Sequence, residues 1–210
     1  MSEEFAPWLL VAGLGAFHGL NPAMGWLFAV ALGLHRGSGR TVVWAMVPIA
    51  LGHALSVGAT LLVFLALGTV LELAFLRRLS GGLLLAWAVW VFRRGHPRRV
   101  RVGMTTGGAG LLLWSFTMAS AHGAGLMLLP ALVPICFADP SGVSPRLATT
   151  SARALLVVLV HGGAMLAVTA FLALLVYRIL GVAVLRKAWI NLDLLWAIAL
   201  AATGFWLLLA

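Results

Sequence analysis

Four histidines lie in long apolar stretches of the sequence, and each has a glycine beside it. They are His18, His53, His122 and His161, next to Gly19, Gly52, Gly123 and Gly162. An ionisable side chain inside a membrane is costly and indicates function by default. Neutral imidazole ligates transition metals and haem iron. One such histidine is equally well explained by a hydrogen bond between helices, but four of them, one per expected helix, predict a shared ligand site.

Further ligand atoms lie at helical spacing from these histidines. Asn21 follows His18 by three residues, so on a continuous helix the two side chains would lie on the same face. Asp193 is the carboxylate furthest inside an apolar stretch, where it would pair with a cation, relay protons or cap a helix. The candidate metal ligands are therefore His18, Asn21, His53, His122, His161 and Asp193.

Two methionines lie one helical turn from these histidines. Met118 precedes His122 by four residues, and Met165 follows His161 by four. Their sulfurs would favour Cu(I), whereas histidine with Asn or Asp suits nickel, cobalt, zinc or iron. Packing alone would also explain both methionines, so their part in the site stays open.

The composition places these residues in a membrane protein. Of the 210 residues, 63% are hydrophobic and 9% are charged, against about 45–50% and about 25% in soluble domains. This excludes a soluble enzyme and a nucleic-acid-binding domain, and the single cysteine, Cys136, excludes an internal disulfide. The net charge of +9 comes from Lys and Arg in short breaks between apolar runs, which is typical of membrane topology.

A bilayer-spanning helix needs about 20 apolar residues. Uncharged stretches cover 5–34, 41–71, 102–138 and 154–177, and weaker ones cover about 73–92 and 188–210. We therefore expect an all-α protein with six transmembrane helices. Ten of the 14 Lys and Arg residues fall in the first, third and fifth loops. This predicts a multi-pass protein of the cytoplasmic (inner) membrane with both termini outside.

Three features recur along the chain at a nearly constant offset. His18 is matched by His122, 104 residues later, and His53 is matched by His161, 108 residues later. Leu76-Arg77-Arg78 and Trp87 are matched, 109 residues later, by Leu185-Arg186-Lys187 and Trp196. We interpret this as one transmembrane domain, 1–210, built from two three-helix repeats at about 5–95 and 104–210. An odd number of helices per repeat makes the repeats inverted, as in many transporters whose substrate site lies where the halves meet.

Both histidines that open the repeats stand beside helix-breaking residues. His18-Gly19-Leu20-Asn21-Pro22 contains one break, and His122-Gly123-Ala124-Gly125 leads to Pro130 and Pro134. Interrupted helices at matching places in two halves indicate a transport site. Ser56 and Ser120 are expected to hydrogen-bond between helices.

In these features the chain resembles the superfamily of lysine exporters, disulfide-reductase membrane domains and nickel/cobalt transporters. It is most similar to the nickel/cobalt branch, through His18 with the Asn21-Pro22 break and through Gly52-His53. The resemblance implies a three-plus-three inverted-repeat fold. The chain lacks the adjacent Asp-His of the nickel permeases, the His-rich loop of the exporters and the paired cysteines of the disulfide carriers. Disulfide chemistry is therefore not implied.

We predict a transporter of a transition-metal cation or a small metal-like solute that uses a histidine site at the membrane midplane. The alternative is a membrane haem-binding or redox protein, because four helix histidines suffice for two bis-histidine haems. No nucleophile–base pair is evident, so we do not expect an enzyme. The predicted partners are the lipid bilayer and the metal ion or solute, without nucleic acid. The identity of the metal, the direction of transport and the formation of a homo-oligomer stay open.

Overall fold

The structure, a computed structural model, describes residues 2–94, 107–137, 147–180 and 192–209. Every element in these ranges is helical, as expected. In chain order they are α1 (Ser2–Leu20), the 3-10 turn η1 (Pro22–Met24), α2 (Trp26–His35), α3 (Gly39–Leu67), α4 (Leu73–Arg94), α5 (Gly108–Ala121), the 3-10 turn η2 (Leu126–Leu128), α6 (Leu129–Phe137), α7 (Leu147–Leu175), the π-helical turn η3 (Val176–Leu180) and α8 (Leu192–Leu209).

Three of the described helices are long and apolar enough to cross a membrane. They cover Gly39–Leu67, Leu73–Arg93 and Thr150–Ile179, the last formed by α7 with η3. A fourth crossing results if the bent pair α5 and α6 counts as one span. The remaining helices α1, α2 and α8 are each shorter than a full crossing within the described residues. The protein is thus an all-helical membrane protein with three or four candidate spans by this measure.

The first break divides the apolar stretch 5–34 into two helices. α1 ends at Leu20, and the Asn21 side chain turns back to accept a hydrogen bond from the Ala23 N–H at 3.0 Å. Pro22 then opens η1, and Gly25 follows in the left-handed region with φ 119°. A side chain at Gly25 would be strained, because L-residues other than glycine rarely adopt this conformation. The interruption predicted at Asn21-Pro22 is therefore present.

The second break divides the stretch 102–138 in a related way. α5 ends at Ala121, His122 caps it, and Gly123 follows with φ 67°. α5 and α6 are bent by 54° relative to each other across this break. Each histidine that opens an expected repeat thus lies at the end of an interrupted helix. Neither stretch forms one continuous helix, since the first is interrupted at Asn21-Pro22 and the second at His122-Gly123.

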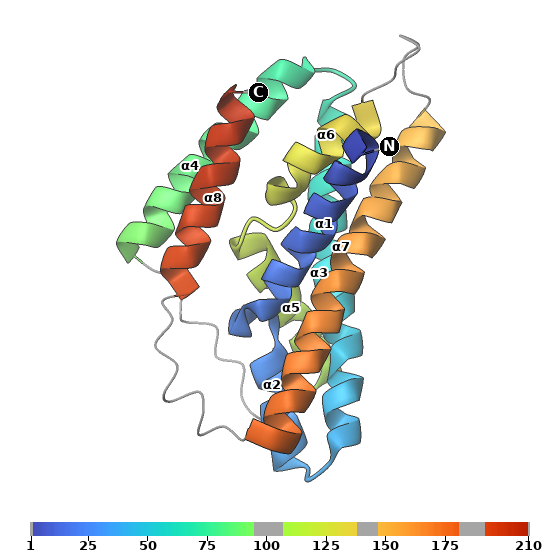
Figure 1. The fold of residues 1–210 in the computed structure, drawn as a ribbon, viewed down its shortest axis with the longest axis vertical. Helices are drawn as coiled ribbons and strands as arrows, with labels where there is room; N and C mark the ends of the chain where they lie inside the picture. Colours follow the sequence, from blue (N-terminus) through green and yellow to red (C-terminus); the bar gives the residue numbers. More distant parts are fainter. Residues whose placement is uncertain (1, 95–106, 138–146, 181–191, 210) are drawn as a thin grey trace.

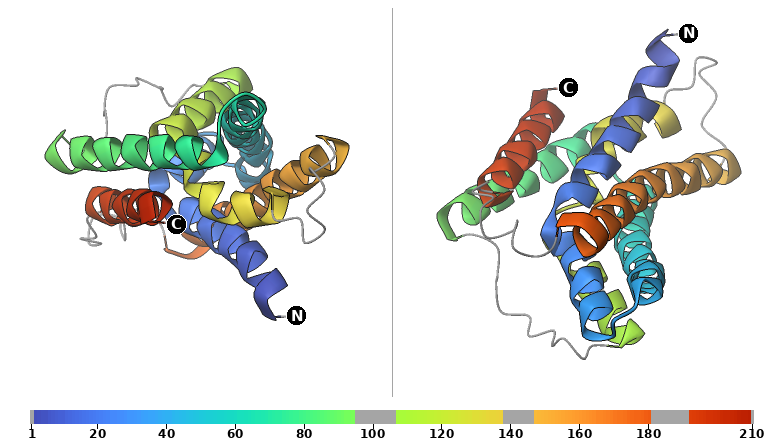
Figure 2. Two further views of the ribbon diagram at one scale, coloured as in Figure 1. Left: turned by 90° about the horizontal axis from the view of Figure 1, so that it is seen from above. Right: turned by 60° about the horizontal axis from the view of Figure 1, so that its bottom comes forward.

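Three helix pairs make up most of the packing: α1 on α7, α3 on α5 and α4 on α8 (Figures 1 and 2). Glycines allow the backbones to approach in each pair. A Cβ atom at Gly15 or Gly52 would lie within 3.0 Å of a carbonyl oxygen of the facing helix, at His161 and Leu112 respectively. In the α4–α8 pair, a Cβ at Gly81 would lie 2.7 Å from the Gly204 oxygen. These small residues therefore serve close helix packing.

Hydrogen bonds between side chains and backbone add to this packing. Ser56 of α3 and Ser120 of α5 are joined hydroxyl to hydroxyl at 2.8 Å, which confirms that both hydrogen-bond between helices. Ser115 also donates to the Ile49 carbonyl at 2.7 Å. Figure 1 shows the ends of the described chain, near Ser2 and Leu209, at one end of the molecule. The turn between α2 and α3 lies at the opposite end.

Candidate functional site

Three of the predicted histidines form one buried cluster, the histidine triad. His18 lies near the end of α1, His53 at the centre of α3 and His161 in α7. Their exposed fractions are 0%, 1% and 0%. The ring centroids of His18 lie 5.7 Å from His53 and 4.9 Å from His161, and His53 lies 5.2 Å from His161. Three separate helices thus bring three imidazoles into mutual contact.

Backbone carbonyls set the proton position on two of the three rings. His18 Nδ1 lies 2.8 Å from the Leu14 oxygen, and His161 Nδ1 lies 3.3 Å from the Val11 oxygen. A carbonyl only accepts hydrogen bonds, so Nδ1 must carry the proton in both rings. The lone pair is then on Nε2. Metal-binding histidines commonly have this arrangement, in which the non-ligating nitrogen donates to a backbone carbonyl.

The Nε2 atoms of the triad lack partners within the described part of the chain. His18 Nε2, His161 Nε2 and both ring nitrogens of His53 are buried without a hydrogen bond. Leaving a buried polar group unpaired costs about 1–3 kcal/mol. Three such groups in one cluster therefore lower the stability of the folded protein considerably. A ligand that binds their lone pairs would remove this cost.

His122 lies beyond this triad, with Trp196 of α8 between them. Trp196 meets the His18 ring edge-on at a centroid distance of 4.6 Å and the His122 ring at 4.8 Å. Its indole N–H donates to the His122 carbonyl at 2.9 Å, and its ring stacks on Phe17 at 5.0 Å. The His122 ring is held by its Nδ1, 2.7 Å from the Met118 oxygen. Three of the four expected histidines thus form the triad, and the fourth, His122, lies on the other side of the Trp196 indole.

Trp196 also lies next to the histidines, although the sequence did not predict it as part of the site. It is 1% exposed and contacts two of the four histidines. Its only signal in the sequence was its match to Trp87 in the repeat. Trp87 behaves similarly, since its indole donates to the Ala121 carbonyl at 2.6 Å, at the same end of α5.

The other candidate ligands are buried or make contacts of their own in the described structure, or have side chains outside what is described. The Asn21 oxygen is used by the Ala23 N–H, so it caps η1. Met165 is buried, and its sulfur accepts a hydrogen bond from Thr169 at 3.3 Å. Met118 is also buried. Asp193 belongs to the first turn of α8, but its side chain lies outside what the structure describes.

An assembled metal centre is not present in the described ranges. No three His, Cys, Asp or Glu side chains there converge closely enough to hold an ion. Two imidazole nitrogens bound to one ion lie about 3.3 Å apart, given metal–nitrogen distances of about 2.0–2.1 Å. The triad rings lie at centroid distances of 4.9–5.7 Å, but their nitrogens do not converge on a common point. The triad therefore places unpaired imidazole nitrogens, which can act as metal ligands, on three neighbouring rings.

Comparison with known proteins gives no match, since no family model, curated protein or solved structure matches the chain. The resemblance to the nickel/cobalt branch therefore stays a prediction.

Proposed function

We propose that the protein is a membrane transporter of a first-row transition-metal cation, or a small metal-like solute, and that the histidine triad binds it. The observation that carries the proposal is the set of three buried Nε2 atoms without partners. Two of these rings are already held in the tautomer that a metal requires. A purely structural histidine in a membrane is expected to satisfy both nitrogens through neighbouring helices.

We also propose six spans arranged as two inverted three-helix repeats. The packing supports this arrangement, because α1 lies on α7 while its repeat counterpart α5 lies on α3, the counterpart of α7. The two third helices of the repeats, α4 and α8, pack on each other. Both interrupted helices break beside a histidine. The triad lies between α1, α3 and α7, so it joins helices of both repeats.

Imidazole donors suit zinc, copper, nickel, cobalt and iron. The Met165 sulfur accepts a hydrogen bond from the Thr169 hydroxyl, and a thioether ligand would favour Cu(I). Since no ion site is preassembled in the described residues, binding requires the rings to turn toward a common point. Such a rearrangement is expected for an ion that must enter and leave, in contrast to a permanently held structural ion.

The haem alternative has no comparable support. A bis-histidine haem places the porphyrin plane between its two axial imidazoles, whereas the triad rings meet at centroid distances of 4.9–5.7 Å. A visible spectrum of the purified protein separates the two proposals, because bound haem gives a Soret band.

The decisive variant is His53→Leu, measured against His35→Leu. His53 makes no described hydrogen bond that leucine would break, whereas His35 is an exposed histidine at the end of α2. Purified protein is titrated with Zn²⁺, Ni²⁺, Co²⁺ and Cu(I), followed by calorimetry and elemental analysis. We expect one ion per chain for the wild type and for His35→Leu. We expect a loss of affinity of roughly hundredfold or more in His53→Leu, because losing a ligand should cost at least as much as losing a residue that only orients one, which costs about 10–100-fold.

Stability distinguishes a ligand site from a structural cluster. Replacing an unpaired buried imidazole by leucine should leave the free energy of unfolding unchanged or raise it. Equal metal binding by His53→Leu and the wild type would contradict the proposal, as would the absence of binding for all four ions. In cells, His18→Ala should change metal content or tolerance, and unchanged values would argue against transport.

A further inference from the structure

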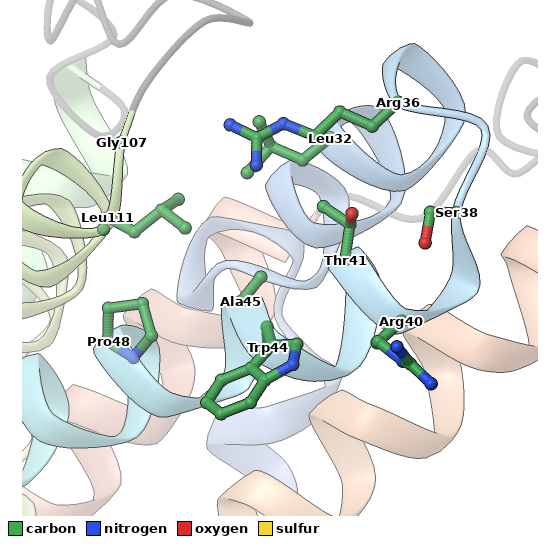
Figure 3. Close-up of a pocket in the computed structure, with 11 residues that line it drawn as sticks. Leu32, Arg36, Ser38, Arg40, Thr41, Trp44, Ala45, Pro48, Gly107 and Leu111 are labelled. Carbon is green, nitrogen blue, oxygen red and sulfur yellow. The ribbon is translucent and has the colours of Figure 1, made fainter.

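A second site lies at the other end of the molecule from the chain ends. A pocket of about 320 Å³ opens where α2 turns into α3 and where α5 begins. We call it the α2–α3 pocket. Figure 3 shows Arg36, Thr41 and Trp44 around it, with Gly107 and Leu111 on the opposite side. None of the triad histidines lines it, so its occupant is independent of the proposed transport site.

The pocket has a positive rim and an apolar floor. Arg36 extends above Leu32 toward the side formed by Gly107 and Leu111, while Arg40 stands at the opposite rim with its guanidinium turned outward (Figure 3). Of the described residues that line the pocket, none is Asp or Glu. The Arg36 guanidinium, a planar group with five donors, therefore faces the pocket without a carboxylate in its lining.

Two helices also begin at this pocket without a side-chain cap in the described structure. α3 starts after Ser38, whose side chain makes no capping hydrogen bond, and α5 starts after Gly107, which has no side chain. The first amide groups of a helix need outside acceptors, and the helix dipole adds roughly half a positive charge there. With Arg36, two uncapped helix starts give the pocket three separate attractions for an anion.

We propose that the α2–α3 pocket binds the phosphate of an anionic phospholipid. A lipid is favoured over free phosphate by the apolar floor, formed by Leu32, Ala45, Pro48 and Leu111. Trp44 is 67% exposed one turn after Arg40, and exposed tryptophan is typical of the membrane–water interface. The phosphate lies against Arg36 and the two helix starts, and the glycerol and the first acyl carbons lie on the apolar floor.

The experiment uses the full chain in detergent, titrated with dioleoyl phosphatidylglycerol, dioleoyl phosphatidylcholine or inorganic phosphate and measured by native mass spectrometry. We expect one retained phosphatidylglycerol per chain and weaker retention of phosphatidylcholine. Arg36→Gln should weaken phosphatidylglycerol binding roughly fivefold, and Arg40→Gln, whose guanidinium turns away from the pocket, should weaken it by a smaller factor. Arg178→Gln, which removes an exposed arginine outside the pocket, should leave binding unchanged.

A second variant reaches the pocket without removing an arginine. At Gly108 a Cβ would meet no described atom within 4 Å, so Gly108→Asp fits. A carboxylate in the first turn also favours the helix. It should nevertheless repel the lipid phosphate and weaken binding. Phosphatidylglycerol binding that is unchanged in Arg36→Gln and Gly108→Asp, or reduced equally by Arg178→Gln, would overturn the site. Phosphate bound as tightly as the lipid, with the same sensitivity to Arg36→Gln, would overturn the assignment to a lipid.

Discussion

The close contact of α3 with α5 positions His53, and Gly52→Ala is the sharpest perturbation of it. A Cβ at residue 52 would lie within 3.0 Å of the Leu112 carbonyl oxygen and 3.0 Å from both the Phe116 nitrogen and the Ser115 Cβ. Two of these three atoms belong to the backbone of α5, so no side-chain rotation relieves the contact. The two helices must move apart.

The cost follows from two contributions. Overfilling a well-packed contact costs about 1–3 kcal/mol. Separation also weakens two hydrogen bonds between the helices, Ser115 to Ile49 and Ser56 to Ser120, which are worth about 0.6 kcal/mol each in membrane proteins. Alanine recovers about 0.5–1 kcal/mol over glycine through its helix propensity. We expect Gly52→Ala to lower the free energy of unfolding by about 1–3 kcal/mol.

Gly58→Ala is the matched control on the same helix. A Cβ at Gly58 meets no described atom within 4 Å, so this variant should gain about 0.5–1 kcal/mol. Reversible unfolding in mixed micelles measures both variants, and metal titration should show weaker binding in Gly52→Ala alone, because His53 moves. If both variants change the free energy of unfolding by the same amount, the contact between α3 and α5 is not what limits this position.

Three further variants test other contacts. Trp196→Phe leaves the buried His122 carbonyl without its indole donor and should cost about 1–3 kcal/mol in unfolding experiments; a loss below about 0.5 kcal/mol would contradict this. A double-mutant cycle of Ser56→Ala and Ser120→Ala should give a coupling energy of about 0.6 kcal/mol, and additive single variants would show that the hydroxyls do not interact. Asn21→Ala removes the acceptor that caps η1 and should lower the melting temperature through a loss of about 1 kcal/mol; an unchanged melting temperature would argue against this cap.

The sequence indicated the helical class, the membrane setting and the places where helices break. Apolar run length predicted α3, α4 and α7, since a hydrogen-bonded helix is the simplest way to satisfy backbone groups in lipid. Asn21-Pro22 marked the first break, because proline lacks an amide hydrogen. The second break lies at Gly123, which adopts positive φ, and not at Pro130 or Pro134, which lie within α6. These signals are local, so no knowledge of neighbouring helices was needed.

The composition of the site was less accessible. The sequence gives the positions of His18, His53 and His122 along their helices. It does not give the rotation of each helix about its axis, because a helix that is apolar on all sides has no polar face that would indicate this rotation. The separation of His122 from the triad by Trp196 depends on that rotation. Asn21 shows another cause. Its three-residue spacing from His18 places both on one face only if the helix continues, and α1 ends at Leu20.

The pairing of α1 with α7 has a consequence for how the chain is made. α7 begins 127 residues after α1 ends, which takes roughly 6–25 seconds at the usual rate of protein synthesis. Throughout that interval His161, whose ring nitrogen reaches back to the Val11 carbonyl 150 residues earlier, has not been translated. α1 is therefore made well before the helix against which most of its packing face lies, and His18 waits for its neighbour His161. Of the three main helix pairs, α1 and α7 are separated by the longest stretch of chain, so this contact forms only after most of the protein has been synthesised.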